Sequence, residues 1–146
     1  MACSPDGLVD IPGLADPLGI YELKCPYTLV KDSMTPQAAA ASKKGFFCKV
    51  GPTGAIELRR NHDYYYQVQG TLAITKRSWC DFVVWTPTAF SVERISFDTK
   101  FWEAAKTKLI RFYKIAILPE LALPRHTSGQ PIREPRTSGD YAITTA

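Results

Sequence analysis

The sequence lacks the residue patterns of several common kinds of site. Its four cysteines stand at positions 3, 25, 48 and 80, and no pair has CxxC spacing. The only histidines are His62 and His126, so the ligand spacing of a zinc site is absent. No apolar run reaches the roughly 18 residues that a membrane-spanning helix needs. The N-terminus also lacks the basic and apolar segments of a signal peptide. We therefore expect an intracellular protein with reduced thiols, no zinc and no membrane span.

The composition is that of a folded domain. The chain has 146 residues, of which 45% are hydrophobic and 12% aromatic, enough for one domain with a core and too apolar for a disordered protein. The formal net charge of +4 is compatible with a polyanionic partner but is shared by many soluble domains.

Strand and helix patterns alternate along residues 1–117. Residues 19–25 alternate with period two, which predicts a strand that Pro26 ends. Thr35 and Pro36 are typical of the start of a short helix. We further expect a strand end over 1–9 that turns at Pro5-Asp6-Gly7, a loop over 10–18, a hairpin of 45–51 with 54–60, strands over 79–86 and 89–97, and helices over 61–76 and 99–117.

The ends of these helices carry capping residues and apolar stripes. Asn61 or Asp63 can cap the first long helix, and Asp98 the second. The expected inner face of the second helix consists of Trp102, Ala105, Leu109, Phe112 and Ile115 or Ala116.

The chain changes character near Pro119. Prolines then recur among Ser, Thr, Gly and Arg, which predicts a disordered tail over 118–146 beside one domain over 1–117. A site motif already stands at the first residues. This position predicts that the chain lacks an N-terminal part of its domain.

Two short motifs carry the chemistry: Ser4-Pro5-Asp6-Gly7 and Glu22-Leu23-Lys24. On a strand, Glu22 and Lys24 project from the same face, while Leu23 is expected to point into the core. Two carboxylates placed together repel each other until a divalent cation neutralises them, and oxygen ligands favour Mg²⁺ or Mn²⁺. The Leu23 carbonyl can add a ligand, and Lys24 can polarise a water. Taken singly, each motif is also a common turn or an exposed ion pair.

The helix over 61–76 adds polar groups. Tyr64, Gln67 and Thr71 share one helical face at i, i+3 and i+7, and Gln69 points elsewhere. Tyr64 and Gln67 can therefore offer a phenol and an amide to the site. Tyr65, Val68 and Leu72 are expected to hold the helix to the sheet.

These motifs, in order and followed by Trp79–Pro87, resemble the YqaJ viral recombinase group of phage lambda-type exonucleases, within the PD-(D/E)xK nucleases. The resemblance covers about residues 2–117. It implies a restriction-endonuclease-like α/β core, a mixed sheet flanked by helices, here lacking its N-terminal helices.

The resemblance also implies a site and a reaction. Asp6, Glu22 and the Leu23 carbonyl would bind Mg²⁺, Lys24 would serve the nucleophilic water, and Gln67 and Tyr64 would lie beside it. Members of the group degrade duplex DNA from its ends, serve recombination or repair, and can be ring-shaped homo-oligomers. They also carry an acidic and several basic residues upstream of the first motif.

Two other functions compete with a nuclease. One is a non-catalytic nucleic-acid-binding module, and the other is a decayed fragment of such a nuclease. The binding module rests on basic residues that can equally be a solvated surface: Lys43, Lys44, Arg59, Arg60, Lys76 and Arg77. For Arg125, Arg133 and Arg136 in the tail, contact with DNA and no role at all both stay open.

Overall fold

The computed structural model describes residues 2–125, 127 and 129–131. They fall into two compact units, Met1–Trp102 and Glu103–Ala146, which are described separately. His126, Arg133 and Arg136 lie outside the described residues, as does most of the predicted tail.

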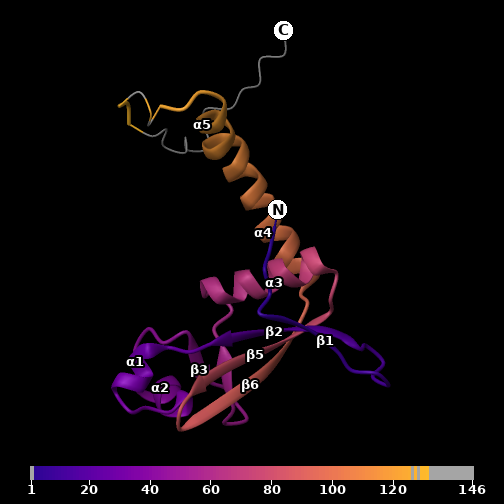
Figure 1. The fold of residues 1–146 in the computed structure, drawn as a ribbon, viewed down its shortest axis with the longest axis vertical. Helices are drawn as coiled ribbons and strands as arrows, with labels where there is room; N and C mark the ends of the chain where they lie inside the picture. The colour runs from indigo at the N-terminus through magenta and orange to yellow at the C-terminus, as the bar shows by residue number, and fades with distance from the viewer. Residues whose placement is uncertain (1, 126, 128, 132–146) are drawn as a thin grey trace. The chain divides into compact units, whose positions relative to one another are not determined.

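The first unit is built on a four-stranded mixed sheet (Figure 1). Its strand order is β1-β2-β5-β6; β2 and β5 run parallel, and the other pairs are antiparallel. A separate two-stranded sheet pairs β3 with β4. The strands are β1 (Gly7–Asp10), β2 (Leu18–Lys24), β3 (Cys48–Val50), β4 (Ile56–Leu58), β5 (Trp79–Thr86) and β6 (Ala89–Ser96). The predicted α/β class with a mixed sheet is confirmed.

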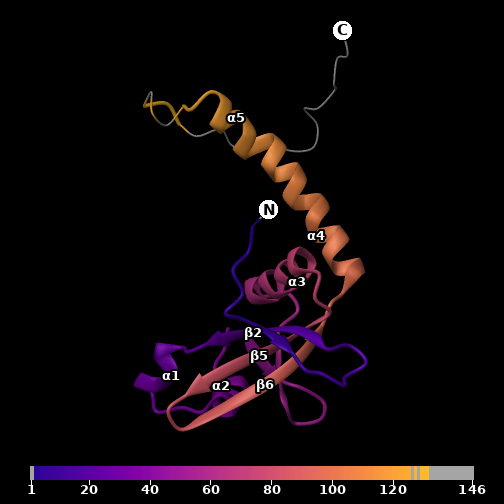
Figure 2. The same ribbon diagram turned by 45° about the vertical axis from the view of Figure 1, so that its right-hand side comes forward.

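Helices flank this sheet. Figures 1 and 2 both show α3 lying along the sheet, with α1 near the end of β2. The helices are α1 (Tyr27–Lys31), α2 (Pro36–Ser42), α3 (Asp63–Thr75) and α4 (Thr99–Phe112), which continues through η1 (Tyr113–Ile117) into α5 (Leu118–Ala122). Among the residues that the structure describes, no helix is long and apolar enough to cross a membrane.

Strand β2 follows the predicted alternation, but its buried face is the polar one. Ile20 is fully buried and Glu22 is 1% exposed, whereas Tyr21 and Leu23 are 39% and 41% exposed. The prediction that Leu23 points into the core is therefore wrong. Side chains of one strand alternate between the two faces of the sheet, and the face that carries Glu22 is the one α3 covers.

The N-terminal segment also differs from its prediction. Strand β1 begins at Gly7, directly after Asp6, and pairs antiparallel with β2 so that Gly7 lies opposite Tyr21. The Tyr21 ring occupies the space that a Cβ at position 7 would need, which accounts for glycine there. The expected turn at Pro5-Asp6-Gly7 is instead the entry to a strand.

Local capping chemistry explains where the helices begin. As predicted, Thr35 caps α2, its Oγ1 accepting from the Ala38 amide at 3.1 Å, and the Asp98 carboxylate accepts from the Phe101 amide at 2.9 Å. The cap of α3 is neither Asn61 nor Asp63. It is His62, whose Nδ1 accepts from the Tyr64 amide at 3.2 Å.

Helix α4 differs from its prediction in its C-terminal half. Trp102 and Ala105 are buried as expected, but Leu109 and Phe112 are 47% and 49% exposed. The short helix α5 lies within the segment predicted to be a tail.

A buried amide ties α3 to the end of β6. Gln69 is fully buried; its Nε2 donates to the Ser96 carbonyl at 3.0 Å, and its Oε1 accepts from the Asp98 amide at 2.7 Å. Both polar groups of the side chain are thus satisfied by backbone at the β6–α4 junction. Nearby, Tyr65, Val68 and Leu72 are buried in the core, as predicted.

Replacing Gln69 should destabilise the fold. We expect Gln69→Leu to lower the free energy of unfolding by about 2–3 kcal/mol, because it removes two hydrogen bonds of a fully buried side chain and leaves the part-buried Asp98 amide and Ser96 carbonyl without that partner. The matched control is Gln37→Leu, which removes an exposed bond to the Gly54 carbonyl and should change stability by less than about 0.5 kcal/mol. Urea unfolding of both variants measures the difference; equal midpoints would contradict the assigned role of Gln69.

The cysteines should differ in reactivity. Burial raises the pKa of Cys48 and that of Cys80 to about 12, while Cys25 is exposed. Since the thiolate is the reactive form, the two buried thiols stay protonated at pH 8. We expect a thiol reagent to modify Cys25 rapidly and Cys48 and Cys80 only after unfolding. Mass spectrometry of the labelled peptides checks this, and fast labelling of Cys48 or Cys80 in the native protein would contradict it.

Candidate active site

The candidate site lies at the carboxyl end of β2, beneath α3. The Glu22 carboxylate is its centre: Oε2 accepts from Lys24 Nζ at 3.2 Å and from Gln67 Nε2 at 3.1 Å. Strand periodicity brings Glu22 and Lys24 to one face, and the helix supplies Gln67 from a position 45 residues away. The other oxygen, Oε1, is buried and has no hydrogen-bond partner within the described chain.

Asp6 reaches the same site from the N-terminal segment. Its Oδ2 accepts from the Leu23 amide at 2.7 Å, which fixes the segment before β1 against the end of β2. The Asp6 side chain is exposed and Glu22 is buried, so one carboxylate of the site is open to solvent and the other is enclosed.

The electrostatics of Glu22 are those of a carboxylate removed from water. Burial raises the pKa of the Glu22 carboxyl above its ordinary value, Lys24 opposes this shift, and the nearby Asp6 adds to it. Lys24 is a single cation beside two carboxylates. The site is therefore short of positive charge when both are ionised.

The aromatic ring of Tyr64 packs against the ammonium of Lys24. The ammonium of Lys24 lies 4.8 Å from the centroid of the Tyr64 ring, within the range of a cation–π contact. The Tyr64 ring in turn packs edge-on against Phe47 at 5.1 Å and near Phe82 at 6.2 Å. Lys24 is thus held between a carboxylate and an aromatic ring that is itself fixed by packing.

The donor set fits a hard divalent cation that keeps part of its hydration shell. Asp6 and Glu22 supply carboxylate oxygens, and Oε1 of Glu22 is an enclosed acceptor to which no described residue donates. Mg²⁺ commonly binds through one or two carboxylates together with waters and phosphate oxygens. Within the described residues, no group of three or more His, Cys, Asp or Glu side chains could hold a metal ion.

The structure brings together five of the residues predicted from the sequence. Asp6, Glu22, Lys24, Tyr64 and Gln67 meet through the contacts given above. Gln69 points elsewhere, as expected. Phe47 and His62 were missed: both pack against Tyr64, but they come from a hairpin and a helix cap, and neither carries a polar pattern that marks a site.

Three of the basic residues considered as a nucleic-acid surface have partners inside the molecule. Arg59 donates to the Phe46 carbonyl, and Arg77 donates to the carbonyls of Val9 and Gly19. Lys43 pairs with Asp32 at 2.6 Å. These three side chains hold loops and strand ends in place, so their charged groups are less available for contact with phosphate.

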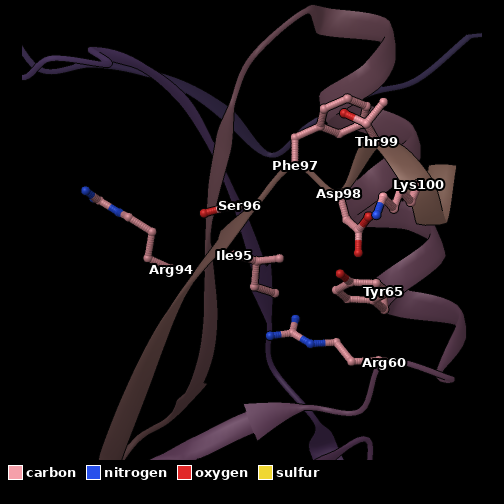
Figure 3. Close-up of a pocket in the computed structure, with 9 residues that line it drawn as sticks. All are labelled: Arg60, Tyr65, Arg94, Ile95, Ser96, Phe97, Asp98, Thr99 and Lys100. Atoms are coloured by element: carbon pink, nitrogen blue, oxygen red, sulfur yellow. The ribbon is translucent and has the colours of Figure 1, made fainter.

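A cleft of about 620 Å³ lies away from this site, between the start of α3 and the β6–α4 junction (Figure 3). Arg60 in it pairs with Glu93 at 2.9 Å, and the Arg94 side chain points away, toward its own partner Asp81. The remaining cation, Lys100, lies near Asp98. Because cations and carboxylates balance there, this cleft offers little net charge to a polyanion.

Comparison with known proteins gives a distant match to solved structures. No protein-family model and no curated protein matches the chain. Two structures of the alkaline exonuclease LHK-Exo from Laribacter hongkongensis are similar to it, one of them in complex with dAMP. Both are 20% identical and cover 88% of this chain; the TM-scores are 0.47 for the complex and 0.46 for the other. The chain spans 63% of the length of those chains.

Proposed function

We propose that this chain belongs to a metal-dependent deoxyribonuclease that hydrolyses phosphodiester bonds of duplex DNA, in the manner of an exonuclease. The observation that carries the proposal is the buried Glu22 carboxylate, which is bound by Lys24 and Gln67 and lies next to Asp6. In the described part of the chain, one of its oxygens has no hydrogen-bond partner. Replacing a buried ion pair by apolar side chains of similar volume is often neutral or stabilising, so the stability of the fold does not by itself account for this group. The alkaline exonuclease activity of LHK-Exo agrees with this reading.

In the proposed reaction, Asp6 and Glu22 would hold Mg²⁺, or Mn²⁺ in its place, with the Leu23 carbonyl as a further ligand. Bound there, the cation would supply positive charge to the phosphate oxygens and acidify a bound water. The other roles fall to the side chains of the chain. The oxygen of a water would attack phosphorus and lose a proton to solvent, while the bond to the leaving sugar oxygen breaks and that oxygen takes up a proton from solvent. The Lys24 ammonium would stabilise the negative charge that develops on the phosphate.

Gln67 and Tyr64 would act by placing Lys24 and Glu22. The Gln67 amide donates to Oε2 of Glu22, so Oε1 is the oxygen of this carboxylate to which no described side chain donates. The Tyr64 ring limits the positions open to the Lys24 ammonium. Preorganised charge of this kind needs no rearrangement when the reaction occurs, which is the main source of electrostatic catalysis.

Removing the charge of Lys24 should reduce cleavage sharply. With labelled duplex DNA and Mg²⁺, we expect Lys24→Gln to lower the cleavage rate by about 10²–10³-fold, the usual cost of losing one preorganised donor. The control is Lys49→Gln. Lys49 is an exposed lysine on the small β3–β4 hairpin, paired with Glu57 at 3.5 Å, and this variant should cleave DNA at the rate of the parent chain.

Gel electrophoresis of timed samples measures both variants in the Lys24 experiment, and circular dichroism checks that they fold. Equal rates for Lys24→Gln and the parent chain would refute this site. DNA binding with steep salt dependence but no metal-dependent cleavage would favour the non-catalytic binding module.

Mg²⁺ should stabilise the fold through the two carboxylates. A ligand present at ten times its dissociation constant stabilises the native state by about 1.4 kcal/mol, which raises Tm by a few degrees in a domain of this size. We expect this increase in the parent chain and its loss in both Glu22→Gln and Asp6→Asn. The amide of Asp6→Asn still offers an oxygen to the Leu23 amide, so that variant tests the charge more than the fold.

Scanning calorimetry with and without Mg²⁺ measures the shift. Asp10→Asn, at an exposed carboxylate in β1, is the control that should retain it. A shift of the same size in both site variants would exclude Asp6 and Glu22 as the ligands.

A further inference from the structure

Tyr27 is the most exposed large aromatic or aliphatic side chain that the structure describes, at 76%. A single exposed aromatic residue is ordinary on a protein surface. Tyr27 differs from such a residue in its placement: β2 ends at Lys24, and α1 begins at Tyr27 after only Cys25 and Pro26. Three Cα–Cα steps of 3.8 Å put its Cα within about 11 Å of that of Lys24.

The position of Tyr27 is fixed by its backbone. Pro26 precedes it with φ of −71°, and the Leu29 amide donates to the Pro26 carbonyl at 2.9 Å. Leu29 is fully buried in the core, and its carbonyl accepts from the Met34 amide at 2.9 Å. A helix as short as α1 is held by such tertiary anchors and not by its own hydrogen bonds. The exposed ring therefore projects from a rigid support.

The other tyrosines near the site are used inside the molecule. Tyr64 packs with Phe47 and carries Lys24, and Tyr65 and Tyr66 each pack against Phe101. Within the part of the chain that the structure describes, Tyr27 has no such ring contact. The face of its ring is therefore available for contact with a binding partner.

A cation shares the helical face of Tyr27. Lys31 stands four residues on, in the last turn of α1, and is exposed. Residues at i and i+4 are neighbours on a helix surface. An exposed aromatic ring beside a cation is the combination with which proteins hold an unpaired base and its phosphate.

We propose that Tyr27 stacks on a base at the end of the DNA strand that enters the site, with Lys31 on the adjacent phosphate. This inference rests on the proposed function, because it takes DNA as the substrate of the neighbouring Glu22 and Lys24. It adds a contact that positions the strand without reading its sequence, since every base offers a π-face.

The test uses duplex DNA with 2-aminopurine as the terminal base, in one probe at the 5′ end and in a second at the 3′ end. Binding is measured with Ca²⁺ in place of Mg²⁺, and a gel confirms that the DNA stays intact. The parent chain should change the fluorescence of one probe. Tyr27→Phe should keep that change, whereas Tyr27→Ala should lose it and bind about 5- to 150-fold more weakly.

Lys31→Gln should keep the fluorescence change and lower the salt dependence of binding by about one phosphate contact. The matched control is Phe90→Ala, because Phe90 is 70% exposed on β6 and should behave like the parent chain. All variants are tested as the full chain.

The Tyr27 proposal is overturned if Tyr27→Ala retains the affinity and the fluorescence change of the parent chain. It is also overturned if Tyr27→Ala changes only the molecular mass in solution, since Tyr27 would then contact another protein chain. A parent chain that binds and changes the fluorescence but never cleaves with Mg²⁺ refutes the nuclease and leaves the stacking contact standing. If the parent chain cleaves DNA and Tyr27→Ala binds and changes the fluorescence as the parent chain does, the stacking contact is refuted and the nuclease is supported.

Discussion

The site depends on one constraint, which is the enclosure of the Glu22 carboxylate between the sheet and α3. A buried carboxylate is costly unless hydrogen bonds and an opposite charge compensate it. Here Lys24 and Gln67 both compensate the same oxygen, and the other oxygen has no donor among the residues that the structure describes. Lys24, Tyr64 and Gln67 of α3 meet around this group, although they are far apart in the sequence.

Two glutamines of α3, separated by a single residue, serve opposite ends of this arrangement. Gln67 reaches the carboxylate of Glu22, while Gln69 binds the backbone at Ser96 and Asp98. On a helix, residues two apart lie about 200° apart around the axis, so one helix can contact the site on one side and the β6–α4 junction on the other. Gln69 thereby fixes the rotation of α3 about its axis, and that rotation decides whether Gln67 reaches the site.

Much of the fold could be predicted from sequence because its periods are local. A strand could be predicted from the alternation over residues 19–25, and helix starts from the capping residues Thr35 and Asp98, because each pattern lies within a few neighbouring residues. The face of the sheet that is covered is a tertiary choice, and the rule that apolar residues point inward gave the wrong answer at Leu23 because the polar site itself is the covered face. The packing of Phe47 on Tyr64 joins segments that share no motif, so no local pattern could indicate it.

The same helix that carries the site also carries the apolar residues that can offset its instability. An unsatisfied buried oxygen costs about 1–3 kcal/mol, and burying one large apolar side chain contributes a similar amount. Tyr65, Val68 and Leu72 of α3 are all buried against the sheet. Because these contacts and Gln67 belong to one rigid helix, α3 cannot move away to hydrate Glu22 without giving up its core packing. The structure can therefore retain an incompletely satisfied carboxylate in a defined position, and this is the property that a metal-binding group in an active site requires.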